Sequence, residues 1–88
     1  MVEIKKTRTM LGTLVDITPP DTKVRRFLRM QGRSGNLTYR DRLEFIVLGE
    51  DGQIEDGFRT SELVRAPHTE KGYVMFETKN SCYKFRQI

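Results

Sequence analysis

The stretch Leu37–Thr60, LTYRDRLEFIVLGEDGQIEDGFRT, decides the fold of this chain. Hydrophobic residues occupy every second position in its middle: Leu43, Phe45 and Val47. This period of two predicts one long strand over Leu37–Leu48, and further apolar residues on its other face indicate a central strand. Asp51-Gly52 then favours a tight hairpin, because these residues tolerate the positive φ angles of such turns. We therefore expect Ile54–Thr60 to return as the partner strand.

The rest of the chain carries shorter stretches of the same pattern. Thr9–Thr18 alternates hydrophobic residues up to a Pro-Pro sequence, and Gly12 within it indicates a bulge or a close backbone approach. Three more strands are expected, of which the last two form a closing hairpin: Leu63–Ala66, Tyr73–Thr78 and Cys82–Ile88. Polar loops are expected at Gly32–Asn36 and at His68–Gly72.

The segment Asp21–Gln31 fits two structures. At period two, Val24, Leu28 and Met30 share one face of a strand, whereas Val24, Phe27 and Leu28 form one stripe of a short helix over 22–31. Its Arg, Lys, Leu and Met residues favour the helix, and the β-rich surroundings favour the strand. We take the strand as the expectation and keep the helix as the alternative.

These elements predict an all-β fold. Five to seven short strands, separated by turn signals about every eight to twelve residues, indicate a single small barrel or a strongly bent antiparallel sheet. A closed barrel would hide its sheet edges, so an SH3-like barrel is the first expectation and an OB-like barrel the second. The 88 residues are expected to form a single domain over 1–88, because so short a chain buries only about 60–65% of its unfolded surface.

The composition argues against several classes of protein. Hydrophobic residues make up 36% and charged residues 32%, without an apolar run near the roughly 20 residues of a membrane-spanning helix or a secretory signal after Met1. We therefore expect a cytoplasmic protein without membrane association. One cysteine, Cys82, and one histidine, His68, are too few for a zinc site, so no metal and no cofactor is expected. The acid pairs Glu50-Asp51 and Glu55-Asp56 belong to a solvated hairpin that cannot raise a carboxyl pKa, so no enzymatic activity is expected.

Charge is distributed unevenly along the chain, whose formal net charge is +4. Seven cations occur from Lys23 to Arg42 against one acid, Asp41, and five acids follow from Glu44 to Asp56. The two groups are expected to gather on different sides of the domain. A basic surface of this kind favours acidic partners such as nucleic acid.

The basic segment also contains aromatic residues. In a strand, Arg25, Phe27 and Arg29 share one face, which puts a ring between cations, as in surfaces that stack a base and hold its phosphates. Tyr39 and its neighbours would add to this face from the next strand. The residues expected to bind an anionic partner are Lys23, Arg25, Phe27, Arg29, Arg33, Tyr39, Arg40 and Arg42. The same charges also fit a solvated surface balanced by the acidic hairpin.

The final third of the chain contains Arg59-Thr60-Ser61 and the hairpin sequence Thr78-Lys79-Asn80-Ser81-Cys82-Tyr83. These motifs resemble small uncharacterised β-barrel proteins of bacteria and their phages, in which an Arg-Thr-Ser turn precedes a hairpin reading Thr-x-Asn-Ser-x-Tyr. The opening Leu11–Thr18 is compatible with the same group. The resemblance implies a barrel and a phage or mobile-element setting, where such proteins act as inhibitors or accessory binders. It does not extend to Lys23–Arg42, so it implies no role for the basic segment.

Taken together, these patterns predict a non-catalytic binding module that recognises an anionic partner, with nucleic acid as the leading ligand. An alternative is a phage- or mobile-element-encoded inhibitor or accessory protein that binds an acidic protein surface. A lesser alternative is the sequestration of a small anionic nucleotide.

Overall fold

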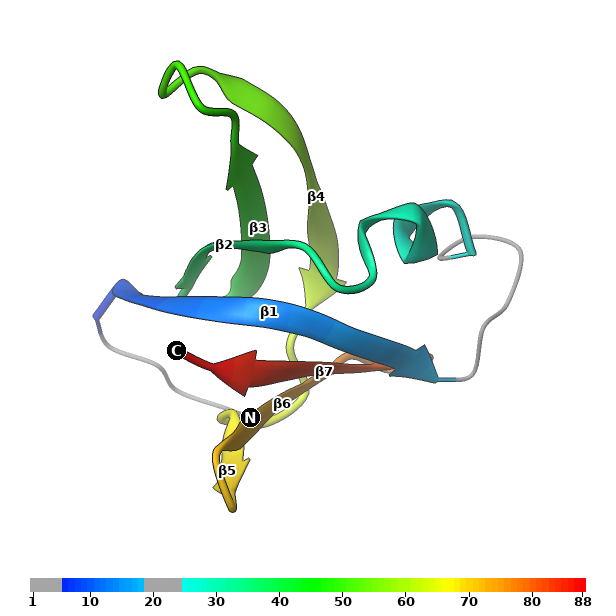
Figure 1. Ribbon diagram of the computed structural model, residues 1–88. Coiled ribbons are helices and arrows are strands. Elements are labelled where there is room, and N and C mark those ends of the chain that lie inside the picture. Colours follow the sequence, from blue (N-terminus) through cyan, green and yellow to red (C-terminus); the bar gives the residue numbers. More distant parts are fainter. Residues whose placement is uncertain (1–5, 19–24) are drawn as a thin grey trace.

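Strands make up nearly all the regular structure of the computed structural model, which describes residues 6–18 and 25–88 (Figure 1). In chain order the elements are β1 (Arg8–Thr18), η1 (Arg25–Met30), β2 (Ser34–Tyr39), β3 (Arg42–Leu48), β4 (Ile54–Glu62), β5 (His68–Glu70), β6 (Tyr73–Glu77) and β7 (Cys82–Gln87). The predicted all-β fold class is confirmed.

The strands form one antiparallel sheet in the order β4-β3-β2-β1-β7-β6-β5. β1 joins its two halves, because it pairs with β2 over its first part and with β7 over its second. A register shift between Leu14 and Asp16 bends β1, as bulges do. Figure 1 shows β3 and β4 standing steeply against β1 and β7. Since β4 and β5 remain edges, the sheet is strongly bent without closing into a barrel.

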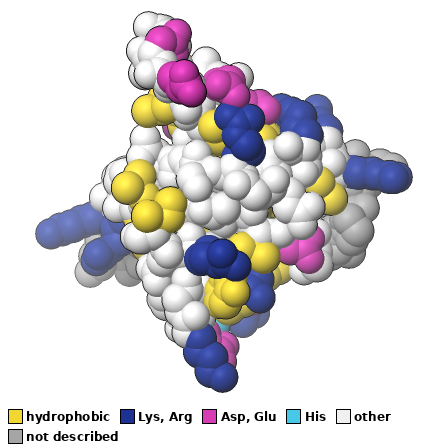
Figure 2. Space-filling view, viewed as in Figure 1, with side chains coloured by type: hydrophobic (Ala, Val, Ile, Leu, Met, Phe, Trp, Pro, Cys, Tyr) yellow, Lys and Arg dark blue, Asp and Glu magenta, His cyan; other side chains and the backbone are white. Residues whose placement is uncertain are grey.

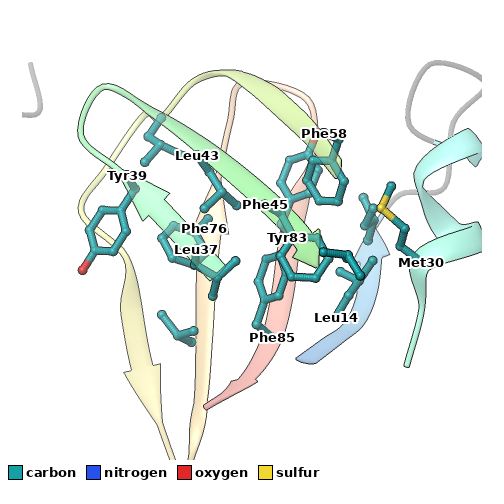
Figure 3. Close-up of a cluster of buried hydrophobic side chains, with 14 residues drawn as sticks. Leu14, Met30, Leu37, Tyr39, Leu43, Phe45, Phe58, Phe76, Tyr83 and Phe85 are labelled. Atoms are coloured by element: carbon teal, nitrogen blue, oxygen red, sulfur yellow. The ribbon is translucent and has the colours of Figure 1, made fainter. Parts of the chain in front are cut away.

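The concave side of the sheet holds one hydrophobic core (Figure 3). The ring of Phe45 in β3 lies 5.5 Å from that of Phe58 in β4 and 5.1 Å from that of Phe85 in β7, measured between centroids. Phe76 of β6 extends the cluster, 5.8 Å from Phe85. Both halves of the sheet thus bury their side chains against each other, which keeps the open sheet bent.

The strand expected over Asp21–Gln31 is wrong for the part of the segment that the structure describes. Arg25–Met30 forms the 3-10 helix η1, as in the alternative, and residues 21–24 lie outside the described residues. Phe27 and Met30 would point to opposite faces of a strand, whereas three residues apart on a helical turn they share a face. Met30 is fully buried and Phe27 packs against the core, so burial decides for the helix.

The single strand expected over Leu37–Leu48 is also wrong, because the structure divides it into two. A tight turn at Arg40-Asp41 separates β2 from β3 and brings Tyr39 opposite Leu43. Both of these side chains are buried, while the charged turn stays in water. The hairpins predicted at Asp51-Gly52 and between β6 and β7 are confirmed.

Smaller differences concern the expected loops. β2 begins inside the loop expected over Gly32–Asn36, and β5 begins inside the one expected over His68–Gly72. The strand expected at Leu63–Ala66 is reduced to a single bridge between Leu63 and Thr78. The parts of β2 and β5 that lie in these expected loops, residues 34–36 and His68–Glu70, are polar and carry no hydrophobic alternation by which a sequence pattern could reveal them.

Two glycines allow close approach between neighbouring strands. A methyl group on Gly12 would lie 2.8 Å from Cδ1 of Leu37 and 3.3 Å from the carbonyl oxygen of Arg86, in agreement with the close approach predicted there. At Gly35 of β2 the methyl would lie 2.9 Å from the carbonyl carbon of Ile46 and nearer still to its oxygen. The backbone of β3 cannot swing aside, so Gly35 has no room for a side chain.

Replacement of Gly35 by alanine is expected to destabilise the fold by about 3 kcal/mol or more, because the added methyl forces β2 away from β3. Gly49→Ala is the matched control, since its methyl would come closest to the ends of the Glu55 and Asp51 side chains, at 3.1 and 3.2 Å, and would meet the backbone only at an ordinary contact of 3.7 Å from the carbonyl oxygen of Gln53. Urea unfolding followed by circular dichroism measures both variants. Equal losses would contradict a specific close approach at Gly35.

Candidate anion-binding site

Three of the expected anion-binding residues lie in the helix η1 and not in the expected strand: Arg25, Phe27 and Arg29. Phe27 stacks on Phe58 of β4, with ring centroids 4.5 Å apart and planes 16° from parallel. The guanidinium group of Arg26 lies 5.0 Å from the centroid of the same ring. The strand face that would hold Phe27 between two arginines is therefore not formed. Lys23 lies outside the described residues.

Two arginines of the expected site, Arg29 and Arg33, pair with acids of β4. The Nε and Nη2 atoms of Arg29 donate hydrogen bonds of 3.0 and 2.7 Å to the two carboxylate oxygens of Asp56. Arg33 pairs with Glu55. The hydrogen bond from Arg29 holds the pKa of Asp56 below its usual value, although partial burial opposes it. These two acids therefore face the basic segment, and the expected separation of the charges is wrong here.

Tyr39 does not present its ring face to a ligand. The side chain is only 8% exposed, and its ring meets Phe76 edge-on with centroids 5.0 Å apart. Figure 3 shows the Tyr39 hydroxyl pointing away from the buried cluster. The ring is thus unable to stack on a base.

Tyr39, Arg40 and Arg42 stay together at the turn between β2 and β3, where they line a shallow hollow of about 290 Å³. Arg59 of β4 lines the same hollow. Arg8 lies opposite Tyr39 in the pairing of β1 with β2. We call these five residues the basic corner. Figure 2 shows Lys and Arg side chains projecting on its left, near the start of β1.

Acids compensate the charge of the basic corner only in part. Arg59 pairs with Glu44 at 2.9 Å, and Asp41 also lines the hollow. The other three arginines of the corner are exposed and have no ion-pair partner among the residues that the structure describes. Their guanidinium groups can therefore take an anion without breaking an existing pair.

A cation–aromatic arrangement that sequence reasoning missed lies on β6 and β7. The Nζ atom of Lys84 is 4.4 Å and the Cζ atom of Arg86 is 5.7 Å from the ring centroid of Tyr73. This is the layout that had been expected around Phe27. The signal was present in the alternation of the closing hairpin, since the buried Val74 next to Tyr73 turns the Tyr73 side chain away from the core.

The remaining reactive groups do not converge. The Nε2 atom of His68 lies 3.3 Å from Glu70 on exposed β5, and β6 separates this strand from Cys82 on β7. Burial, and to a lesser degree the charge of Glu77, raises the pKa of the Cys82 thiol, which lowers its thiolate fraction. Residues 6–18 and 25–88 contain neither a group of three potential metal ligands nor a helix long and apolar enough to span a membrane.

Replacement of Asp56 by asparagine tests the pair with Arg29. Because the folded-state pKa of Asp56 is lowered, its ionised form stabilises the fold above the unfolded-state pKa of about 3.9. This stabilisation is lost as the pH falls through the folded-state pKa. Urea unfolding should show a lower midpoint for Asp56→Asn than for the wild type near neutral pH, with a difference that shrinks below about pH 5.

Glu50→Gln is the control for this prediction, because Glu50 is an exposed acid of the same hairpin without an ion pair in the described part of the chain. Glu50→Gln should have the urea midpoint of the wild type both near neutral pH and below about pH 5. A midpoint difference for Asp56→Asn that stays constant with pH would contradict the pair.

Comparison with known proteins assigns no family to the chain. No family model, no curated protein and no solved structure matches it. The resemblance of the final third to small β-barrel proteins of bacteria and their phages therefore stays a prediction.

Proposed function

We propose that this protein is a non-catalytic binding module whose anionic partner is nucleic acid, and that phosphate groups bind at the basic corner. The observation that carries the proposal is the hollow at the turn between β2 and β3, lined by Arg40 and Arg42, with Arg8 opposite Tyr39 on β1; all three arginines are exposed and have no ion-pair partner among the described residues. A guanidinium group presents a planar fork of donors that matches a phosphate.

The shape of the hollow favours a phosphate of a longer chain over a free nucleotide. Its volume of about 290 Å³ lies just below the roughly 300–1,000 Å³ that is usual for small-molecule pockets. A nucleotide would be held there by its phosphates while its base remained in water. A nucleic acid adds contacts along its backbone, so the corner suits a polymer better.

The acidic tip of the β3–β4 hairpin does not cancel the attraction of the corner. Its carboxylates appear at the top of Figure 2, away from the corner. Arg42 begins β3 and the tip follows the end of the strand, seven residues later. At about 3.4 Å per residue this separation exceeds 20 Å, well beyond the Debye length of about 8 Å at physiological salt. Nucleic acid is therefore attracted at the corner and repelled only near the tip.

The double variant Arg40→Ala/Arg42→Ala tests this function. Fluorescence anisotropy with labelled single-stranded DNA and RNA is measured from about 50 to 200 mM salt. Wild-type affinity should fall with salt, because phosphate contacts release counterions. The variant should bind about tenfold more weakly or worse. Its log–log salt dependence should be smaller by about 0.7 for each phosphate contact that is lost.

The control is Lys71→Asn/Lys79→Ala, which removes two exposed positive charges outside the corner. Asparagine is chosen at Lys71 because that residue has a φ of +52°, which asparagine tolerates. The control should bind nearly as the wild type does. No binding at low salt, or equal losses in both double variants, would refute the corner as the binding site.

Exposed hydrophobic side chains favour a second candidate, an inhibitor or accessory protein that binds another protein. Leu11 and Ile88 are 53% and 73% exposed, and the backbone N–H of Ile88 donates to the carbonyl oxygen of Leu11 at 3.2 Å. Leu48 and Ile54, which pair across β3 and β4, are also exposed. Adjacent exposed hydrophobic residues are typical of protein-binding surfaces.

A pull-down from bacterial lysate, with and without nuclease, separates the two candidates. A protein that is retained after nuclease treatment and lost with Leu11→Ser/Ile88→Ser would support the second candidate, because binding would then depend on the hydrophobic surface. Nucleic acid would be supported if nuclease treatment removes the partner and the Leu11→Ser/Ile88→Ser variant still binds it.

A further inference from the structure

The outer side of the β6–β7 hairpin carries a ring placed between cations. Tyr73 lies directly opposite Arg86 in the pairing of the two strands, and Met75 lies opposite Lys84. Val74 is buried, so Tyr73 and Met75 point away from the core. We call Tyr73, Met75, Lys84 and Arg86 the Tyr73 face. In the lower half of Figure 2, hydrophobic side chains over β6 and β7 lie between Lys and Arg side chains.

We infer that the Tyr73 face stacks a nucleobase and that the nucleic acid bound by this protein is therefore single-stranded. This inference rests on the proposed function and deepens it, because the basic corner alone recognises phosphate and cannot distinguish nucleic acid from other polyanions. Aromatic side chains on a sheet surface, with cations beside them for the backbone, are the usual means of binding single strands.

The cations can make room for a base. Lys84 and Arg86 have no ion-pair partner among the described residues, and both contact the ring of Tyr73. A cation above a half-buried ring at the surface, such as that of Tyr73, is held weakly compared with a stacked base. An arriving base can therefore replace the Lys84 ammonium group at the ring, and the long lysine side chain can turn its charge to the adjacent phosphate.

Neighbouring strands extend this surface with neutral polar groups. Thr13 of β1 lies opposite Arg86 on one side and opposite Ser34 of β2 on the other, and the two hydroxyl groups are 2.7 Å apart. Hydroxyl groups of this kind can hydrogen-bond to bases or sugars without repelling phosphates. The surface thus continues from Tyr73 toward the centre of the sheet.

Nearby acids favour a single strand over a duplex. Glu70 lies opposite Tyr73 on β5, and Asp16 lies opposite Lys84 on β1, so carboxylates border the Tyr73 face on both sides. One phosphate backbone can follow the cations between them, whereas the second backbone of a duplex would meet a carboxylate. A duplex also keeps its bases stacked inside, where Tyr73 cannot reach them.

The test compares a thymidine oligonucleotide of about 20 nucleotides with an abasic oligonucleotide of the same length, which keeps the phosphates and lacks the bases. Wild-type protein should bind the thymidine strand at least about fivefold more tightly, and a duplex no better than the abasic strand. Tyr73→Leu should bind the thymidine strand as weakly as the abasic one, and its abasic affinity should be unchanged. Tyr73→Phe, which keeps the ring, should retain the preference.

The outcomes separate this inference from the proposed function. If wild-type protein binds both strands equally, or Tyr73→Leu weakens both equally, base stacking at Tyr73 is refuted while phosphate binding stands. If Arg40→Ala/Arg42→Ala loses affinity for both the thymidine and the abasic oligonucleotide, the basic corner is supported independently of Tyr73. If neither strand binds at low salt, both proposals are refuted. The wild-type comparison needs no variant, so a Tyr73→Leu protein that unfolds still leaves the inference testable.

Discussion

The packing of Phe45 between Phe58 and Phe85 is the contact on which the rest of the structure depends. The sheet has two free edges, so backbone hydrogen bonds alone do not fix the angle between its halves. Phe58 comes from β4 at one edge, and Phe85 comes from β7 beyond β1. Because Phe45 touches both rings, the bend in the sheet is coupled to burial of the core. Truncation of such a ring typically costs about 3–5 kcal/mol, a large part of the stability of a domain this small.

The same core determines where the charges lie. Phe27 stacks on Phe58, and this contact requires a helical turn at η1, which brings Arg29 within reach of Asp56 on β4. An exposed ion pair contributes little, whereas burial of a phenylalanine contributes about 1.5–3 kcal/mol. Packing therefore sets the position of the helix, and the ion pairs follow from it. The basic segment consequently loses part of its free charge to the acids of β4.

Much of the fold could be predicted from the sequence, because the period-two pattern reports which residues face the core. That pattern is strong in β1, β6 and β7, which were predicted close to their true bounds, and it also placed the end of β3 at Leu48. It could not reveal the turn at Arg40-Asp41. Tyr39 and Leu43 are four residues apart, so the period of two places both side chains on the same face whether the strand continues or the chain reverses between them. It could not settle η1 either, because that choice depends on Phe58, distant in the sequence.

The candidate site could be predicted only where its residues are neighbours in the sequence. Arg40 and Arg42 were expected to act together, and they meet at one hollow because a single turn carries them. Their companions Arg8 and Arg59 come from other strands and depend on sheet register. Tyr73 was overlooked for a different reason. The closing hairpin supplies aromatic residues to the core, so Tyr73 could have been one of them. Only the burial of Val74 shows that the Tyr73 ring lies on the outer face of the sheet.

Because a chain of this length fills a single core, the outer side of its sheet is free of packing demands. Tyr73 lies outside the buried cluster, so its ring is not needed to hold the bend. The two proposed sites also differ in the elements that carry them, in a way that suits their ligands. A ring fixed on a paired strand keeps the orientation that stacking requires, since sites on regular elements are more precise than sites on turns. Exposed arginines beside a turn can follow a phosphate backbone of varying path. In the proposed mode of binding, Tyr73 on β6 therefore orients a base, and the arginines at the turn between β2 and β3 attract the phosphates.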